Sequence, residues 1–389
     1  MKKVISILVM LAVLFACFAS GTQEKTKGET PVQVAIKEAV SLSWDELLVK
    51  AKAEIGNNEL LVLASTSRFD EQSFTEKTGI KVKATNNAPS EIFEKVGAEV
   101  GEGLYSTDIV ASVDSYNFNY ASQNGWIENY VPKAFKSHIP VDNQNPLALV
   151  YYNRLFMYNN NNGELKNYIK NVWQFAELEM NGFEIKNPLL ETNTMNFLIT
   201  LTKEENQKIL ADTYKSYYGK EWNNSGEYKN IAYEWVHKFL KNAIFNNSDG
   251  TIVKNLAKSK PGATGVAVYS KFRSGDTSSI GVAAFEDTEG FAGFLFPLYI
   301  GVASTAKYPY AACLYINYCL GREGFINIFG KDVGGYSSNN EVTISENAKN
   351  AGDRELPFWK TCLIAEDMDY VTSSYAETFT LFSQWCADK

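Results

Sequence analysis

Residues 43–111 alternate helical and strand patterns at short spacing, and this order limits the fold more than any other feature of the chain. Ser43 and Glu46 form a capping box at the start of an amphipathic segment, which predicts a helix. Short apolar runs bounded by turns and helical patterns follow, which is typical of buried strands in a parallel sheet. The predicted strands are residues 60–64, 80–84 and 108–111. The resulting βαβαβ order predicts an α/β fold with a doubly wound, mostly parallel sheet.

A second α/β unit is predicted over about residues 147–290. Its strand patterns include a long extended segment at 146–159 and "TGVAVYS" at 264–270, with helical patterns between them. The segment 295–303 is again strand-like. Two helices are expected within 309–330, separated near Gly321, and the C-terminal tail is mostly helical.

The chain has 389 residues and a formal net charge of −8. An acidic chain of this size argues against nucleic acid as a partner, and its length suits one large domain or two lobes. No apolar run after the N-terminus is long enough to cross a membrane. There is also no internal repeat that would indicate an adhesin or a structural protein.

The N-terminus has the pattern of an export signal. Lys2 and Lys3 precede an apolar run that is too short to span a bilayer, and Ala16 is a small residue next to Cys17. The segment "LFAC" resembles the lipobox of bacterial lipoproteins, in which the cysteine is acylated and becomes the new N-terminus. The resemblance implies that residues 1–16 are a signal peptide and that Cys17 is lipidated; a plain secretory signal is the alternative. The polar residues 17–42 are expected to be a tether.

Motifs for catalysis are missing from the sequence. His138 and His237 are the two histidines, and neither accompanies a nucleophile motif. No phosphate loop or dinucleotide fingerprint is present. We therefore expect a protein that is not an enzyme and has no catalytic cofactor. The spacing of the cysteines matches no zinc site. Cys362 and Cys386 could pair in an oxidising compartment.

Ligands of doubly wound sheets bind outside the carboxyl ends of the strands. This rule selects hydroxyl-rich loops in the first unit as the candidate site. They are Ser65–Arg68, Thr85–Ser90 and Ser112–Ser115. The alternative is that these Ser and Thr residues only cap the helices that follow them. The two roles are compatible, because the N-terminus of a helix attracts anions.

The order of segments over about residues 43–340 resembles the solute-binding lipoproteins of ABC importers, specifically the iron(III)-type class. The resemblance is carried by six blocks in the family's order. They are "SWDELLVKAKAEIGNNELLVLAST", "FTEKTGIKVKAT", "STDIVASVDS", "NGWIENYVPKAF", "VWQFAELEMNGFEIKNP" and "YPYAACLYINYCLGREGF".

This resemblance implies the two-lobed type II periplasmic binding protein fold, with a hinge between the lobes. Residues 43–146 with about 297–340 would form lobe 1, and about 147–296 with 341–389 would form lobe 2. The lobes would close on one small solute, and the closed form would deliver it to a membrane permease. The protein would be exported, monomeric and anchored by lipid to the cell membrane, facing the periplasm.

The resemblance makes ferric iron the first candidate ligand. Members with iron sites use two adjacent tyrosines, but only Tyr269 is found in "TGVAVYSKFR", where Ser270 follows it. A lobe 1 acid of the family corresponds to Asp114. Tyr269 and Asp114 are thus the expected metal ligands, and Arg154 lies where members carry an arginine near an anion.

An organic or phosphorus oxyanion is the alternative ligand, because Arg68 and Arg154 would suit a carboxylate or a phosphate as bidentate partners. The sequence predicts the same set of ligand contacts for both cases. These are Ser65, Thr66, Arg68, Ser112, Asp114, Tyr152, Arg154, Thr192, Asn193, Tyr269 and Tyr299.

Overall fold

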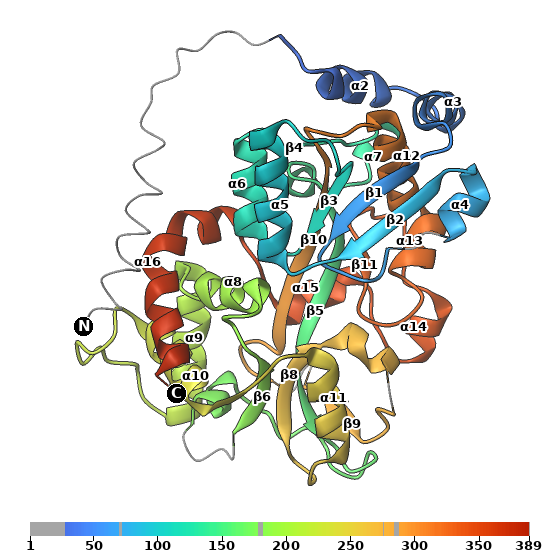
Figure 1. The fold of residues 1–389 in the computed structure, drawn as a ribbon. Coiled ribbons are helices and arrows are strands. Elements are labelled where there is room, and N and C mark those ends of the chain that lie inside the picture. The colour runs from blue at the N-terminus through green and yellow to red at the C-terminus, as the bar shows by residue number, and fades with distance from the viewer. Residues whose placement is uncertain (1–27, 70–71, 178–181, 275, 284–287, 389) are drawn as a thin grey trace.

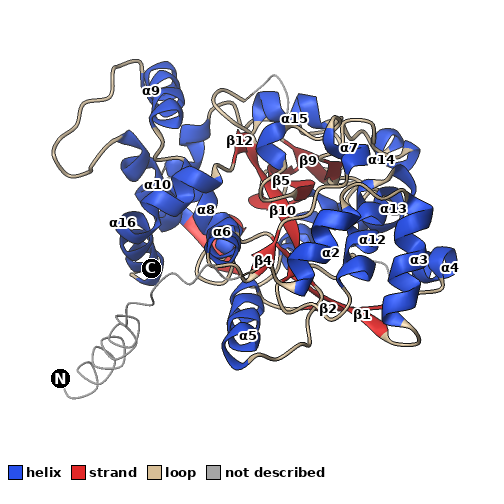
Figure 2. Ribbon diagram, turned by 90° about the horizontal axis from the view of Figure 1, so that it is seen from above, coloured by secondary structure: helices blue, strands red, loops and turns tan. Residues whose placement is uncertain are grey.

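A computed structural model describes residues 28–69, 72–177, 182–274, 276–283 and 288–388. The predicted signal peptide and Cys17 lie outside these residues. The chain forms one mixed sheet with helices on both of its faces (Figures 1 and 2). The strand order is β2-β1-β3-β10-β5-β8-β6-β7. Within the described residues, no helix combines the length and apolar character that a membrane span requires.

The first half of the sheet is parallel, as the sequence predicts. It contains β1 (Glu59–Ala64), β2 (Lys81–Asn86) and β3 (Ile109–Ser112), with β1 in the middle. The helices of this half are α3 (Trp44–Ile55), α4 (Gln72–Thr78), α5 (Pro89–Glu102) and α6 (Ser115–Gln123). Helix α3 begins at the predicted capping box of Ser43 and Glu46.

The second half of the sheet contains another parallel set. Strand β6 (Phe183–Lys186) lies between β7 (Ala243–Asn246) and β8 (Thr264–Val268). The helices of this half are α8 (Thr192–Thr200), α9 (Glu204–Tyr218), α10 (Ile231–Asn242) and α11 (Asp249–Lys258). The carboxyl ends of both parallel sets point toward the middle of the molecule (Figure 1).

Two long antiparallel strands join the halves. They are β5 (Ala148–Asn159) and β10 (Gly293–Ala303), which pair with each other along most of their length. The far end of β10 pairs with β3 of the first half, whereas the far end of β5 pairs with β8 of the second half. The sheet is therefore mixed. Both halves share this central pair, which is where a hinge between two lobes would lie.

Close packing of the central pair requires glycine at Gly293. Its φ is +143°, and a Cβ atom at this position would lie 2.1 Å from the carbonyl oxygen of Arg154. A side chain at this position is therefore sterically excluded, and its conformation is one that L-residues rarely adopt. Gly293 thus fixes the approach of β10 to the part of β5 that carries Arg154.

Shorter elements complete the fold. The strands are β4 (Ile127–Glu128), β9 (Ile280–Val282), β11 (Tyr336–Ser337) and β12 (Ile364–Ala365). The helices are α2 (Pro31–Ala39), α7 (Lys133–Lys136), α12 (Pro309–Leu320), α13 (Arg322–Ile328), α14 (Glu346–Asn350), α15 (Leu356–Cys362) and α16 (Met368–Ala387). Turns of 3-10 helix are η1 (Val141–Asn143), η2 (Val172–Ala176) and η3 (Tyr269–Ser274). Cys362 on α15 and Cys386 on α16 are both thiols.

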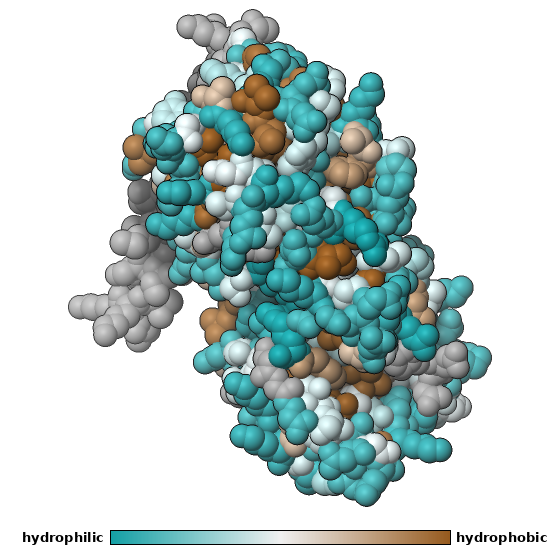
Figure 3. Space-filling model, turned by 90° about the vertical axis from the view of Figure 1, so that its right-hand side faces the viewer, coloured by the Kyte–Doolittle hydropathy of each residue, from teal (hydrophilic) through white to brown (hydrophobic). Residues whose placement is uncertain are grey.

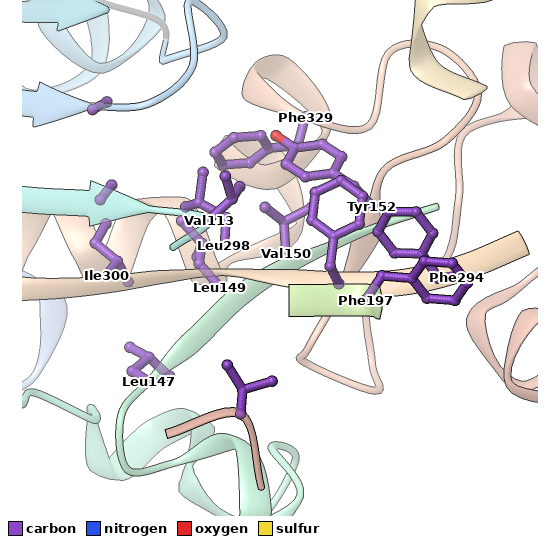
Figure 4. Packing of buried hydrophobic residues seen from close by; sticks show 14 of the residues in the cluster. Val113, Leu147, Leu149, Val150, Tyr152, Phe197, Phe294, Leu298, Ile300 and Phe329 are labelled. Carbon is purple, nitrogen blue, oxygen red and sulfur yellow. The ribbon is translucent and has the colours of Figure 1, made fainter. Parts of the chain in front are cut away.

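The hydrophobic core follows the central strands and is rich in aromatic side chains. Phe197 of α8 stacks on Phe294 of β10, with ring centroids 4.3 Å apart, and Tyr152 of β5 lies near Phe329 (Figure 4). The ring of Tyr152 also contacts that of Phe296. The outer surface in Figure 3 is mainly hydrophilic, and its hydrophobic residues form small separate groups. The hydrophobic core is thus continuous between the two halves of the molecule along strands β5 and β10.

The C-terminal helix α16 contacts both halves of the molecule. On the first half, Tyr375 stacks on Tyr116 of α6 with centroids 3.8 Å apart. On the second half, α16 packs against α8 and α10, and the hydroxyl groups of Tyr370 and Thr202 are 2.9 Å apart. The sequence assigns this tail to lobe 2 alone. The lobe boundaries remain a prediction, but α16 bridges the two halves.

Residues 31–39 differ from the sequence prediction. They were expected within a polar tether but form helix α2, so the tether prediction is wrong for this segment. The physical reason is an apolar stripe that packs α2 against α12, formed by Val32, Ala35, Ile36 and Ala39. A capping box of Thr30 and Gln33 starts the helix. Residues 17–27 lie outside the described part of the chain.

Candidate functional site

A cavity of about 380 Å³ lies between the two halves, where the carboxyl ends of the two parallel sets face each other. The loops after β1, β2 and β3 contribute one wall, and the segments after β6 and β8 contribute the other. The lining residues of the first half are Ser65, Thr66, Ser67, Arg68, Asn86, Asn87, Ala88, Pro89 and Val113. Those of the central pair and the second half are Tyr152, Arg154, Lys186, Leu190, Glu191, Asn193, Asp249, Val268, Ser270, Lys271, Arg273 and Phe296.

The wall of the first half is ordered by its own hydroxyl groups. Ser65 Oγ accepts a hydrogen bond of 3.1 Å from the backbone N–H of Val113, which ties the loop after β1 to the loop after β3. Thr66 Oγ1 accepts a bond of 3.3 Å from the backbone N–H of Arg68. These bonds position the Arg68 side chain at the cavity wall.

Arg154 lies at the centre of the cavity wall and is fully buried. Its Nη1 is 3.0 Å from Oδ1 of Asp249, and its Nη2 donates to Oδ1 of Asn193 over 3.3 Å. Burial lowers the pKa of the guanidinium, and the neighbouring Asp249 acts against that change. The Nε of Arg154 is buried without a hydrogen-bond partner among the described residues. This donor of Arg154 is thus unsatisfied among the described residues.

A second ion pair lies beside the first. Lys186, at the end of β6, pairs with Glu191, and Glu191 is also 4.0 Å from Nη2 of Arg154. Burial lowers the pKa of Lys186, and the charge of Asp249 opposes this effect. The two carboxylates of the cavity are therefore already matched by the cations Arg154 and Lys186.

Three more cations line the cavity without such a match. Arg68 donates to the backbone carbonyl of Phe329 over 2.9 Å, and Arg273 donates to that of Ser270 over 2.8 Å. Lys271 lies on η3 next to Arg273. Within the part of the chain that the structure describes, none of these three residues has a carboxylate within 4.0 Å. The cavity is thus locally positive in an acidic chain.

Tyr152 supplies an aromatic surface and a hydroxyl group. The guanidinium of Arg68 lies 5.5 Å from its ring centroid, which is within the range of cation–π attraction. Burial raises the pKa of Tyr152, and Arg68 opposes that change. The buried hydroxyl has no hydrogen-bond partner of ordinary geometry among the described residues. The side chains of Thr66 and Arg68 lie near this hydroxyl and also oppose the rise in its pKa.

Three helices start at the cavity. Ala88 is the N-cap of α5, Glu191 is the N-cap of α8, and Asp249 is the first residue of α11. In each helix the N-cap side chain makes no capping hydrogen bond. First-turn N–H groups carry partial positive charge and bind anions. They therefore add to the positive character of the side chains.

The structure brings some of the predicted contacts together in this cavity and places others elsewhere. Those that line the cavity are Ser65, Thr66, Arg68, Tyr152, Arg154 and Asn193. Those that do not line it are Ser112, Asp114, Thr192, Tyr269 and Tyr299. The contacts of the second group show why they lie elsewhere.

Tyr269 points away from the cavity because β8 ends at Val268 and the chain turns into η3. Its ring packs against Phe272 and Trp359, at centroid distances of 4.9 and 5.9 Å. Tyr299 is similarly buried against Phe118. The expected iron ligand Tyr269 is therefore part of the core, and burial raises its pKa rather than favouring a phenolate.

Asp114 and Ser112 have local structural partners. Asp114 is buried and caps α6, where it accepts hydrogen bonds from the backbone and side chain of Asn117. Ser112 Oγ accepts from the backbone N–H of Asp114 over 3.1 Å. The hydroxyl of Thr192 is buried at the start of α8 without a hydrogen-bond partner among the described residues. Tyr269 and Asp114 thus do not meet at a common metal site in this arrangement.

Five charged residues of the cavity are not among the contacts predicted from the sequence. They are Lys186, Glu191, Asp249, Lys271 and Arg273. The rule about the carboxyl ends of strands applies equally to β6, β7 and β8. These residues lie at or after the ends of those strands, so the same rule is the signal that points to them.

The described residues contain no group of three or more His, Cys, Asp or Glu side chains placed to hold a metal ion. The two carboxylates of the cavity are also occupied by ion pairs. The donor set of the cavity consists mainly of N–H and O–H groups. Such a set suits a solute that accepts hydrogen bonds and carries negative charge.

No protein-family model matches the chain, and no curated protein matches it either. Solved structures are similar in fold at low sequence identity. A ferric binding protein from Campylobacter jejuni has a TM-score of 0.63 and 17% identity, covering 84% of this chain and 99% of its own. Trichodesmium IdiA, in complex with iron and citrate, has a TM-score of 0.60 and 16% identity over 84% and 99%. The binding protein AgtB from A. tumefaciens R10, in complex with agropinic acid, has a TM-score of 0.57 and 12% identity over 85% and 98%.

These similarities show that the chain has the α/β fold of type II periplasmic binding proteins, as the sequence predicts. The similar structures include proteins described with iron and one described with an organic acid. At this level of identity, the similarity concerns the fold.

Proposed function

We propose that this protein is the solute-binding component of an importer and that its solute is a small oxyanion. The observation that carries this proposal is the charge of the cavity between the halves. Among the described residues that line it, cations outnumber carboxylates by five to two, counting Arg68, Arg154, Lys186, Lys271 and Arg273 against Glu191 and Asp249. A carboxylate or phosphate bound there would be held by charge-assisted hydrogen bonds from both halves.

Capture follows from the placement of these groups. A solute held by Arg68 on one wall and by Lys271 or Arg273 on the other favours the closed arrangement over the open one, because it contacts both walls only when they are close together. The shared strands β5 and β10 are the elements that would act as the hinge. The cycle requires no covalent chemistry.

Ferric iron held together with an anion is the second candidate. The observation in its favour is that similar structures include a ferric binding protein and one with iron and citrate. In this cavity, an anion such as citrate would supply ligands that the chain itself lacks there. Tyr152 would be the tyrosine nearest to such a complex, in place of Tyr269.

The cellular setting is part of the same proposal. The N-terminal pattern with Cys17 suggests export and a lipid anchor at the cell membrane, facing the periplasm. The partner for release would be the membrane permease of an ABC importer, which the closed form would contact. We expect the protein to act as a monomer.

Isothermal titration calorimetry tests the proposed function. Purified protein would be titrated with inorganic phosphate, phenyl phosphate, succinate, citrate and ferric citrate, and with neutral sugars as a control. Binding of an oxyanion without iron supports the first candidate. Binding of ferric citrate, but not of citrate, supports the second. If none of these solutes binds but a neutral sugar does, the proposal of an oxyanion is wrong.

A further inference from the structure

Among the described residues, three cations of the cavity have no carboxylate within 4.0 Å, and they come from opposite walls. Arg68 belongs to the loop after β1 in the first half, whereas Lys271 and Arg273 belong to η3 in the second half. The carboxylates of the cavity instead pair with Arg154 and Lys186. The unmatched charge is therefore concentrated on these three side chains.

Arg68 and Arg273 face each other across the space between the halves. Both line the cavity of about 380 Å³, and both also line a neighbouring cavity of about 510 Å³. They thus form the boundary that the two cavities share. Each is held by a backbone carbonyl of its own surroundings, that of Phe329 for Arg68 and that of Ser270 for Arg273. Neither guanidinium can therefore turn away without losing a hydrogen bond.

The three like charges influence one another. Burial lowers the pKa of Arg273, and Arg68 lowers it further, although Tyr152 and Asp332 oppose this. The pKa of Lys271 is lowered first by burial and then by Arg273, with Arg68 and Arg154 adding to the effect and Asp249 opposing it. Repulsion between the walls is thus present in the arrangement without a solute.

We propose that Arg68, Lys271 and Arg273 form an electrostatic gate, which holds the two halves apart when the cavity is empty and closes on an organic solute that carries at least two negative charges. This inference rests on the proposed function, and it adds the charge class of the solute and the cause of opening. The gate residues act on the open–closed equilibrium as well as on affinity. A solute closes the gate by removing the repulsion and by bonding to both walls.

The charge balance of the cavity sets the required charge of the solute. Three cations without a carboxylate among the described residues remain partly uncompensated by a single negative charge. A solute with two or more charges can pair with both walls at once. The selectivity then comes from the like charges that a monoanion leaves unpaired.

The size and lining of the cavity point to an organic molecule. Its volume lies within the usual range for small-molecule sites, which is roughly 300–1,000 Å³. Tyr152, Phe296 and Leu190 give part of the lining an aromatic or apolar character. These surfaces would contact the body of the solute, whereas the gate would contact its charged groups.

The first test compares probes that differ by one charge. Calorimetry on the full chain would use phenyl phosphate against methyl phenyl phosphate, and succinate against succinamate. If the dianion of a pair binds, the gate predicts that the matching monoanion binds at least tenfold more weakly. The two pairs also distinguish a phosphate ester from a dicarboxylate. Equal binding of the dianion and the monoanion would overturn the gate while leaving the proposed function intact, whereas no binding of any anion would overturn both.

The second test measures opening without a solute. Small-angle scattering of the empty protein should show a smaller radius of gyration as NaCl rises from 10 mM to 1 M, because salt screens repulsion between the walls. R273Q should be compact already at low salt. The matched control is K208Q on the exposed face of α9, which should behave as the wild type. A wild-type radius that does not change with salt would overturn the gate, and this measurement needs no variant to fold.

Discussion

Arg154 of β5 and Asp249 of α11 form a buried ion pair at the cavity wall, with 3.0 Å between Nη1 and Oδ1. The pair joins the central strand to the start of a helix, since Oδ1 of Asp249 also accepts a hydrogen bond from the backbone N–H of Val268. Asp249 therefore positions Arg154 and fixes the end of β8. Its replacement has consequences for stability that are separate from solute binding.

The variant D249N should destabilise the protein by about 3–5 kcal/mol, because it leaves the charge of Arg154 buried without its main partner. Urea unfolding at pH 7 measures this loss. The matched comparison is the double variant R154M/D249N, which removes the unpaired charge and should be more stable than D249N alone. If the loss of unfolding free energy in the double variant equals the sum of the losses in R154M and D249N, the two charges are not coupled.

Much of the fold could be predicted from the sequence because its signals are local. The capping box of Ser43 and Glu46 begins α3, and the apolar runs at 60–64 and 108–111 fall in β1 and β3. Such patterns depend on residues that are close in the chain. The rule about strand ends then selected Ser65, Thr66 and Arg68, which line the cavity.

The remaining site residues depend on where strands end and on what packs nearby. Tyr269 lies within the strand pattern "TGVAVYS" at 264–270, but β8 ends at Val268, directly before the tyrosine, and the ring packs against Trp359. Lys186 and Asp249 come from segments far apart in the chain, and only the packed sheet brings them together. No local pattern carries that information.

Glu366 should make stability depend on pH. Its carboxyl group is buried, and burial raises its pKa to about 8, although Ser115 and Asn196 oppose this rise. The groups around it are Asp114 and Ser115 from the first half, Asn196 from α8, and Asp367. The raised pKa means that the folded protein holds a proton that the unfolded chain loses near pH 4.5.

The free energy of unfolding should therefore fall as pH rises from about 4.5 to 8, by about 1.4 kcal/mol per pH unit from this group. The variant E366Q cannot ionise and should lose this part of the slope while remaining stable at pH 8. Urea unfolding at several pH values measures it. E346Q on the exposed α14 is the control and should keep the slope. If the unfolding free energy of E366Q depends on pH as in the wild type, the carboxyl group of Glu366 does not cause this dependence.

The stack of Tyr116 on Tyr375 should couple α6 to the C-terminal helix. The rings are 3.8 Å apart at an angle of 12°, and such aromatic pairs contribute about 0.5–1.5 kcal/mol beyond the area that they bury. A double-mutant cycle with Y116L and Y375L should give a coupling energy of about 1 kcal/mol in unfolding experiments. A coupling near zero would show that α16 does not connect the halves through this contact.

Helix α2 should be ordered in solution even though its segment reads as polar. Val32, Ile36 and Ala39 are buried against the first half, and Thr30 caps the helix by accepting a hydrogen bond of 3.2 Å from the N–H of Gln33. Hydrogen exchange should therefore be slow for the amides near residue 39 and faster at residues 28 and 29. T30A should speed exchange across the helix, since loss of such a cap costs about 1 kcal/mol. S41A, which follows the helix, is the control and should leave its first turn unchanged. If residues 31–39 exchange at the rate of an unstructured peptide, the segment is not a stable helix in solution. The tether predicted from the sequence would then be correct for this segment.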